Sequence, residues 1–301
     1  MILVTGATGM FGGGVTAELA ARGAPVRAMT SNPSKVDELA RPGVEPVVGD
    51  MDRPETLAPA VDGVDTVFLV SPMDDRVKVR EGNVLAAAHE AGVRRIVKLA
   101  GAVKHHGDPL GRLHDASVEA IRSSSLEWAL LSPTSVLETS LFSMLPWIEA
   151  TGAIVACAGD GKVAHVAAAD VARAGAVILA AGSENGRDYV ITGPQLLSYA
   201  GLCEILSRVT GRSIPYVDVS ENDLEQALVE QAGMTPEQAE IGVICHFRAW
   251  RNGDAEALSH TYKELTGREP TTAEQWITEH AEPFAQARDK APASQDASTA
   301  S

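Results

Sequence analysis

The sequence predicts an α/β fold, in which a doubly wound parallel sheet is followed by a smaller, mostly helical C-terminal lobe. Three observations predict it: short apolar runs alternate with helical patterns, a glycine-rich turn follows the first run, and the alternation stops near residue 135. Such runs are typical of parallel strands that are buried on both faces of a sheet. The 301 residues, 45% of them hydrophobic, suffice for one large domain with a lobe built on it.

Six apolar runs are the expected strands of the sheet. They cover residues 2–4, 25–29, 44–48, 66–70, 95–99 and 128–131. Two of the intervening helices, over 16–22 and 79–91, end before Gly23 and Gly92, where a helix terminus favours a left-handed residue. A late helix over 169–181 and a late strand over 189–192 are expected to return to the same sheet.

A glycine pattern, Gly6-Ala7-Thr8-Gly9-Met10-Phe11-Gly12, comes directly after the first expected strand. A strand that ends in a glycine turn and opens into a helix brings backbone N–H groups and the positive end of the helix dipole against a pyrophosphate. Glycine is needed there because a side chain would block the approach. The turn therefore predicts a Rossmann-type dinucleotide site, although its GxxGxxG spacing differs from the commoner GxGxxG.

The end of the second strand selects between NAD and NADP in such folds. No acid lies in the stretch from Arg27 to Lys35, whereas Thr30, Ser31 and Asn32 offer polar groups. These residues and Lys35 fit a 2′-phosphate better than a bare ribose, so NADP(H) is favoured over NAD(H). A plain polar turn is the alternative.

Two further strand ends offer cofactor contacts. Asp50, followed by Met51, is expected to accept a hydrogen bond from the adenine amino group, and Ser71 is expected to line the edge of the cofactor. Helix or turn capping is the alternative for both Asp50 and Ser71.

Three regions follow from this pattern. Residues 1–150 form the expected NAD(P)-binding domain, to which residues 163–195 return. Residues 196–289 form the smaller lobe over a pocket. Residues 290–301 are rich in Ala, Ser, Thr and Gln without periodicity, which predicts a disordered tail.

Composition excludes several classes of protein. The 25 basic and 40 acidic residues give a formal charge of -15, which repels nucleic-acid phosphates. Three cysteines without a CxxC motif indicate reduced thiols, and no apolar run approaches the ~20 residues of a membrane span. We expect a cytoplasmic monomer or homodimer that acts on a small molecule, without direct nucleic-acid or membrane binding.

Several segments together resemble the NmrA-like group of atypical short-chain dehydrogenases/reductases. They are the glycine turn, Gly49-Asp50, residues 95–99, Leu131-Ser132-Pro133-Thr134, Gly159-Asp160-Gly161 and Asp170-Val171-Ala172. The resemblance covers about residues 1 to 285. It implies the predicted fold and one of three functions: NADP-dependent reduction of quinones or dyes, cofactor sensing without turnover, or tailoring of natural products in secondary metabolism.

Carried over by position, the resemblance and the residue patterns imply one set of cofactor contacts. The set is Gly6, Thr8, Gly9, Met10, Phe11, Gly12, Ser31, Asn32, Lys35, Asp50, Met51, Val70, Ser71, Pro72, Ala100, Gly101, Ala102, Pro133, Thr134 and Ser135. The sequence departs from the group's usual residues at four positions. Ser31 and Ser132 replace arginines, Ala100 replaces a serine and Thr139 replaces an asparagine.

The usual catalytic pair of short-chain reductases is missing. These enzymes place Tyr and Lys four residues apart on a helix, where the ammonium lowers the pKa of the phenol. None of the four tyrosines is followed by lysine at that spacing. In the helix before the sixth strand, His114 and Val118 occupy the two places. His114 is the candidate for proton transfer, an ordinary partly exposed histidine being the alternative.

Other residues are expected around the substrate. His105 and His106 lie in a loop that faces a pocket, and Phe142 and Trp147 are candidates for contact with a flat acceptor. Plain helix core is the alternative for Phe142 and Trp147. No metal site is predicted, because no set of three or four ligands shows the required spacing.

The missing pair favours a particular reaction. A reduced quinone is a phenolate-like anion whose conjugate acid has a pKa of about 10, so water can protonate it. We therefore expect an NAD(P)H-dependent oxidoreductase that transfers hydride to a quinone or another flat conjugated carbonyl. The alternatives are a tailoring enzyme performing coupling, cyclisation or isomerisation, and a non-catalytic NADP(H)-sensing regulator.

Overall fold

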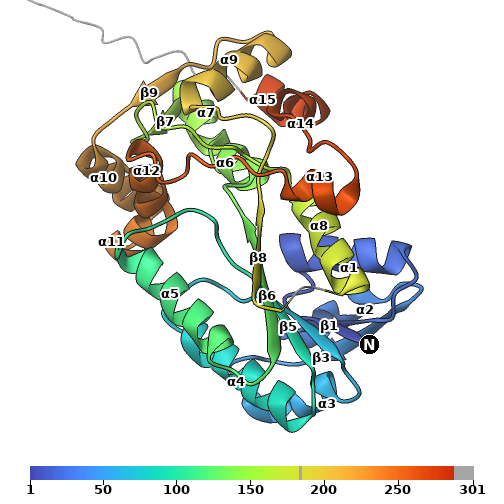
Figure 1. Ribbon diagram of the computed structural model, residues 1–301. Helices are drawn as coiled ribbons and strands as arrows, with labels where there is room; N and C mark the ends of the chain where they lie inside the picture. Colours follow the sequence, from blue (N-terminus) through green and yellow to red (C-terminus); the bar gives the residue numbers. More distant parts are fainter. Residues whose placement is uncertain (183–184, 288–301) are drawn as a thin grey trace, which may run out of the picture.

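A seven-stranded parallel sheet forms the centre of the computed structural model, which describes residues 1–182 and 185–287 (Figure 1). The strands lie in the order β3-β2-β1-β4-β5-β6-β8. Their bounds are β1 (Ile2–Val4), β2 (Val26–Thr30), β3 (Val44–Val48), β4 (Thr66–Leu69), β5 (Arg95–Leu99), β6 (Glu127–Pro133) and β8 (Arg187–Ile191). The order reverses between β1 and β4, which is where nucleotides bind in doubly wound sheets. The predicted fold class is confirmed.

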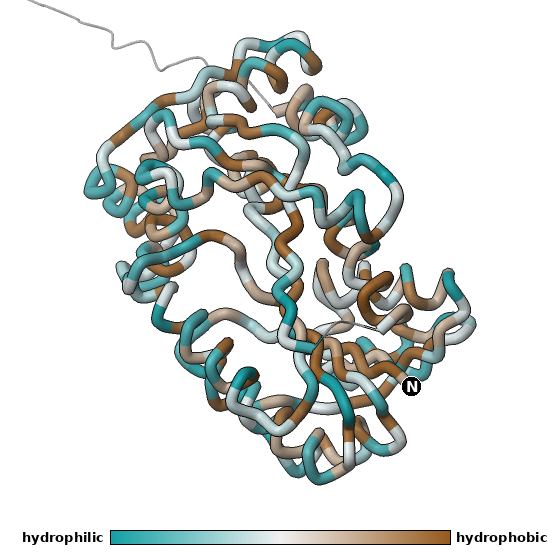
Figure 2. Tube along the Cα trace, viewed as in Figure 1, coloured by the Kyte–Doolittle hydropathy of each residue, from teal (hydrophilic) through white to brown (hydrophobic). Residues whose placement is uncertain are grey.

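Helices cover both faces of the sheet. On one face lie α1 (Met10–Ala21), α8 (Ala168–Ala181) and α13 (Thr261–Thr266); on the other lie α3 (Ala58–Val61), α4 (Val77–Glu90) and α5 (Pro109–Arg122). Residues of β5 alternate between the two cores, with Val97 in the first and Ile96 in the second. Figure 2 shows the hydrophobic residues gathered along the central strands.

Short elements connect the first three strands. A 3-10 turn, η1 (Pro33–Lys35), and α2 (Val36–Leu39) lead from β2 to β3, and the 3-10 turn η2 (Pro54–Thr56) precedes α3.

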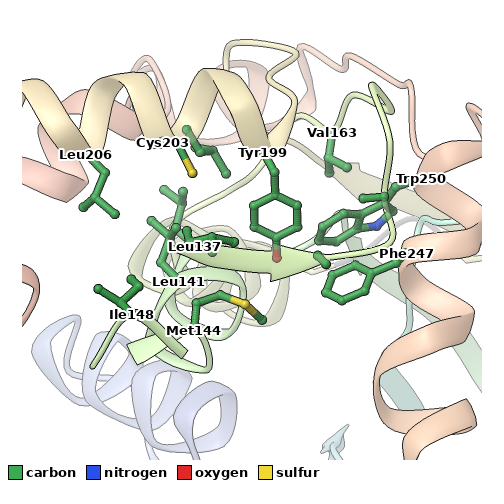
Figure 3. Packing of buried hydrophobic residues seen from close by; sticks show 14 of the residues in the cluster. Leu137, Leu141, Met144, Ile148, Val163, Tyr199, Cys203, Leu206, Phe247 and Trp250 are labelled. Carbon is green, nitrogen blue, oxygen red and sulfur yellow. The ribbon is translucent and has the colours of Figure 1, made fainter. Parts of the chain in front are cut away.

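The C-terminal part of the chain is mostly helical. It contains α6 (Leu137–Phe142), α7 (Leu145–Thr151), α9 (Tyr199–Thr210), α10 (Glu221–Ala232), α11 (Pro236–Ala239), α12 (Cys245–Arg251), α14 (Ala273–Glu279) and α15 (Ala281–Gln286). A π-helical turn, η3 (Glu240–Ile244), precedes α12, and β7 (Ile154–Ala156) pairs in parallel with β9 (Tyr216–Asp218). Their shared core surrounds Tyr199, whose ring lies 5.6 Å from Phe247 and 5.4 Å from Trp250 (Figure 3).

The structure differs from the sequence prediction mainly at element boundaries. Helix α1 begins at Met10 rather than at residue 16. The prediction missed its first turns because glycines, which have poor helix propensity, occupy them. Strand β6 runs on to Pro133, which pairs with Ile191 of β8. The predicted tail, 290–301, lies outside the described residues. No helix of the described ranges is long and apolar enough to cross a membrane.

Candidate functional site

The segments that follow β1, β4, β5 and β6 are joined along one edge of the sheet. Thr5 Oγ1 donates to the Val70 carbonyl and accepts from the Val70 N–H, both at 2.8 Å. The Ala102 N–H donates to the Pro133 carbonyl at 3.0 Å. Because all strands are parallel, these carboxyl ends form a continuous edge, on which the predicted nicotinamide-side residues lie.

The glycine turn has the shape that a pyrophosphate requires. Gly6 has a φ of 58°, and a Cβ added at Gly12 would lie 2.3 Å from the Gly6 carbonyl oxygen. Helix α1 starts from Gly9 without a side-chain cap, so the N–H groups of its first turn remain for a ligand. Thr8 and Met10 are exposed beside them. The residues present fit the diphosphate of a dinucleotide.

The turn after β2 carries the residues predicted to contact a 2′-phosphate. Asn32 caps η1, since its Oδ1 accepts from the Ser34 N–H at 3.0 Å and from the Ser34 hydroxyl at 2.8 Å. Ser31 and Lys35 are exposed on the same turn. The turn thus has the local hydrogen bonds of an Asx turn and leaves a hydroxyl and an ammonium facing solvent.

Asp50 and Met51 lie in a tight turn after β3. The Asp50 N–H donates to Thr56 Oγ1 at 2.8 Å, while its own carboxylate accepts from the Asp52 N–H at 2.9 Å. Asn83 of α4 donates to the Met51 carbonyl at 2.8 Å. The turn is therefore fixed to α4, with the Asp50 side chain only partly buried.

His114 lies on α5 against the backbone of the loop that follows β5. A Cβ added at Gly101 would lie 3.4 Å from His114 Cε1. The ring stacks at 6.1 Å on His105, which has His246 of α12 at its edge, 5.2 Å away. His114 Nδ1 is buried without a hydrogen-bond partner among the described residues.

The surroundings of His114 determine its charge. The pKa of His114 is lowered to about 4, chiefly by burial and also by the neighbouring His105 and Lys98, against the opposite effect of Glu81. The imidazole is therefore neutral at pH 7. It can donate one N–H hydrogen bond, but it carries no imidazolium proton to transfer.

The loop between β5 and α5 contacts the C-terminal part. His105 Nδ1 lies 3.2 Å from Asp108 Oδ2, and Asp108 also caps α5 by accepting from the Gly111 N–H at 2.7 Å. His106, which has a φ of 27°, reaches Asp254 with Nε2 at 3.0 Å. The two predicted pocket histidines thus hold this loop against the region around α12.

Phe142 and Trp147 lie in the C-terminal core. The Phe142 ring packs 5.1 Å from Trp276 and 5.8 Å from Phe284, and Trp147 packs against the same cluster. This is the packing of a helix core, the alternative that the sequence left open. Contact of these two residues with a substrate stays a prediction.

Sequence reasoning missed a buried polar cluster beneath the nicotinamide side of the edge. Glu81 of α4 pairs with Lys98 of β5 and accepts hydrogen bonds from Ser71 and Ser117. The available signal was Lys98 itself, a lysine inside the buried strand 95–99. Nothing in the spacing of the sequence identified Glu81 as its partner.

A second missed group lies deeper in the C-terminal core. His165 is buried beside Trp250, with ring centroids 5.3 Å apart. Neither His165 ring nitrogen makes a hydrogen bond of normal geometry, and burial lowers the pKa of His165 to about 4 despite the nearby Val163 backbone. No group of three or more possible metal ligands occurs among the described residues.

The fold and this edge define a Rossmann-type protein whose glycine turn fits a dinucleotide. The chain belongs to the NmrA-like family, whose model matches residues 1–277. It is 34% identical, over 95% of this chain and 99% of the relative, to a (4-alkanoyl-5-oxo-2,5-dihydrofuran-3-yl)methyl phosphate reductase of Streptomyces griseus. It is 31% identical to the NAD(P)H azoreductase of Xenophilus azovorans, over 94% and 99% of the two chains.

A solved structure agrees with these relatives. The triphenylmethane reductase of Citrobacter sp., complexed with NADP(H), superposes with a TM-score of 0.82 at 30% identity, over 93% of this chain and 100% of that one. The protein is therefore an NAD(P)H-dependent oxidoreductase.

Proposed function

We propose that the protein is an NADPH-dependent reductase of flat, conjugated acceptors such as quinones or unsaturated carbonyl compounds. The observation that carries the proposal is the neutral His114, which packs against Gly101 after β5 in a chain that also has a complete dinucleotide turn after β1. A neutral imidazole stabilises charge on an acceptor oxygen by donating a hydrogen bond, yet it is a poor proton donor to a strongly basic alkoxide. Acceptors that delocalise the added charge suit such a site.

The relatives support this class of acceptor. The name of the Streptomyces relative describes a ring double bond conjugated with carbonyl groups, and the other two proteins are named for azo compounds and triphenylmethane dyes. All these compounds are conjugated electron acceptors. Ser31 and Lys35, exposed after β2 in a turn without an acid, support a preference for NADP(H) over NAD(H).

The residues along the sheet edge would contact different parts of the cofactor and the acceptor. Bound NADPH supplies the hydride. Gly6, Gly9 and Gly12 would hold its diphosphate through backbone donors, and Asp50 would accept from the adenine amino group. The segments 70–72, 100–102 and 133–135 would line the nicotinamide half, and His114 would donate its N–H to the acceptor oxygen, leaving water to supply the proton.

Stopped-flow mixing tests the proposal. The purified protein, loaded with NADPH or with NADH, is mixed with a panel of quinones, an azo dye, a triphenylmethane dye, a conjugated unsaturated lactone and a simple aliphatic ketone. We expect NADPH oxidation by at least one conjugated acceptor, slower reaction with NADH, and no reaction with the ketone. Absence of oxidation across all the conjugated acceptors would contradict the proposal.

A further inference from the structure

Four polar side chains from four different elements meet in the core below the nicotinamide side of the edge. The Lys98 ammonium of β5 lies 2.5 Å from Glu81 Oε1 of α4, and both side chains are at most 1% exposed. The Ser71 hydroxyl, just after β4, donates to the same oxygen at 2.5 Å. The Ser117 hydroxyl of α5 donates to Oε2.

The fold alone does not require a charged pair here. Lys98 shares its face of the sheet with Ile96, and Glu81 shares its side of α4 with Val84; Ile96 and Val84 belong to the hydrophobic core between sheet and helices. Desolvating two charges is costly, and well-packed apolar residues of similar volume are often neutral or stabilising in their place. The pair therefore calls for a role other than packing.

Ser71 connects the pair to the cofactor edge. It lies just past the carboxyl end of β4, one residue after Val70, which is bonded to Thr5 directly before the glycine turn. Its side chain is partly exposed, whereas Ser117, Glu81 and Lys98 are buried. The cluster thus reaches the edge of the sheet through the Ser71 hydroxyl, while Lys98 and Glu81 also act electrostatically on His114.

The cluster also fixes the direction of the Ser71 hydrogen bond. A serine hydroxyl has one proton to donate and two lone pairs that accept, whereas an ionised carboxylate only accepts. Glu81 accepts the hydrogen bond that the Ser71 hydroxyl donates, and Lys98 holds the accepting oxygen in place by donating to the same atom. Ser71 therefore presents only lone pairs toward the edge.

We propose that Glu81 and Lys98 are positioning residues, which hold the Ser71 hydroxyl as a hydrogen-bond acceptor for the nicotinamide half of the dinucleotide. The groups that Ser71 would accept from are the ribose hydroxyls or the carboxamide N–H₂ of that half. The inference rests on the proposed function, because it requires a dinucleotide at this edge.

Direct titration with NADPH, followed by calorimetry and without any acceptor, tests this role. The Glu81→Leu/Lys98→Met double variant removes both charges at similar volume. We expect it to unfold at the same or higher urea concentration than the wild type, yet to bind NADPH about 5- to 10-fold more weakly, the effect of one misdirected hydrogen bond. Ser71→Ala is expected to weaken binding to a similar extent.

The triple variant separates positioning from a general effect on the fold. If the pair acts through Ser71, adding Ser71→Ala to the double variant weakens NADPH binding no further. A matched control removes the exposed ion pair Arg208–Glu274, whose atoms lie 2.6 Å apart in the C-terminal part, by Arg208→Met/Glu274→Leu. This control is expected to bind NADPH like the wild type.

The outcomes are distinguishable. Wild-type affinity in the double variant, or additive losses in the triple variant, would overturn the positioning role while leaving the proposed function intact. A wild-type protein that binds neither NADPH nor NADH would refute the proposed function and this inference with it. If the double variant does not fold, Glu81→Gln/Lys98→Met takes its place, with the same direction expected, because an amide can turn its N–H₂ toward Ser71.

Discussion

Gly12 tolerates the least change of the residues in the nucleotide turn. A Cβ there would lie 2.3 Å from the Gly6 oxygen and 2.9 Å from the Thr5 oxygen, both backbone atoms that cannot rotate away. We expect Gly12→Ala to displace the turn, to raise the Kd for NADPH by about tenfold or more, and to cost about 1–3 kcal/mol of stability. Calorimetric titration and urea unfolding measure the two effects.

A glycine in open space provides the control for this substitution. Gly82 lies inside α4, and nothing stands within 4 Å of the position that its Cβ would take. Gly82→Ala should leave NADPH binding unchanged and stabilise the protein by roughly 0.5–1 kcal/mol through helix propensity. Equal NADPH affinity in Gly12→Ala and Gly82→Ala would show that the turn does not hold the diphosphate.

At the scale of single elements, the start of α5 depends on Asp108. Its Oδ1 accepts from the Gly111 N–H at 2.7 Å and its Oδ2 faces His105, so one carboxylate both caps the helix and holds the preceding loop. Asp108→Ala is expected to lower the free energy of unfolding by about 1 kcal/mol, the usual cost of a lost N-cap. Urea unfolding at pH 7.5 measures this change.

Two further substitutions, one at the N-cap and one within α5, show whether the cap or the charge of Asp108 matters. Asp108→Asn keeps a capping oxygen, so it should recover most of the loss. Asp115→Ala removes an exposed carboxylate from the middle of α5 and should change stability by less than about 0.5 kcal/mol. A destabilisation as large in Asp115→Ala as in Asp108→Ala would mean that charge, and not the cap, is responsible.

Among the helices and strands, some boundaries were predictable from the sequence and others were not. The strands at 2–4 and 66–69 were predictable because they are buried on both faces, which demands short apolar, β-branched runs. The first turn of α1 was hidden by its own glycines, which close packing requires: a Cβ at Gly12 would lie 2.3 Å from the Gly6 oxygen and one at Gly14 2.9 Å from Ala172 Cβ. Boundaries that tertiary packing determines therefore escape rules based on propensity.

The candidate site was predictable in part for a similar reason. The glycine turn is contiguous in sequence, so its local chemistry is visible before any fold is known. The Glu81–Lys98 pair joins residues from a helix and a strand, and their meeting depends on how α4 packs across β5. Likewise, His105 and His246 come together only when α12 folds back over the loop.

At the scale of the whole molecule, acid is expected to destabilise the fold, because three buried or partly buried histidines are neutral in it. Burial lowers the pKa of His114, His165 and His246 to about 4 each. An unfolded chain binds protons at these residues near pH 6.5, so it gains protons first as the pH falls. Their contribution to stability is complete above pH 6.5 and is lost between pH 6.5 and 4.

His165 offers the sharpest test of this dependence. Because its ring nitrogens lack normal hydrogen bonds and its ring packs against Trp250, leucine can replace it without breaking a hydrogen bond of normal geometry. Urea unfolding should show that the free energy of unfolding of the wild type is lower at pH 5 than at pH 7.5. On the order of 2 kcal/mol of this difference should arise from His165. His165→Leu should lose correspondingly less, whereas His260→Gln, which alters an exposed histidine, should follow the wild type. Parallel losses in wild type and His165→Leu would mean that His165 is not held neutral by the core.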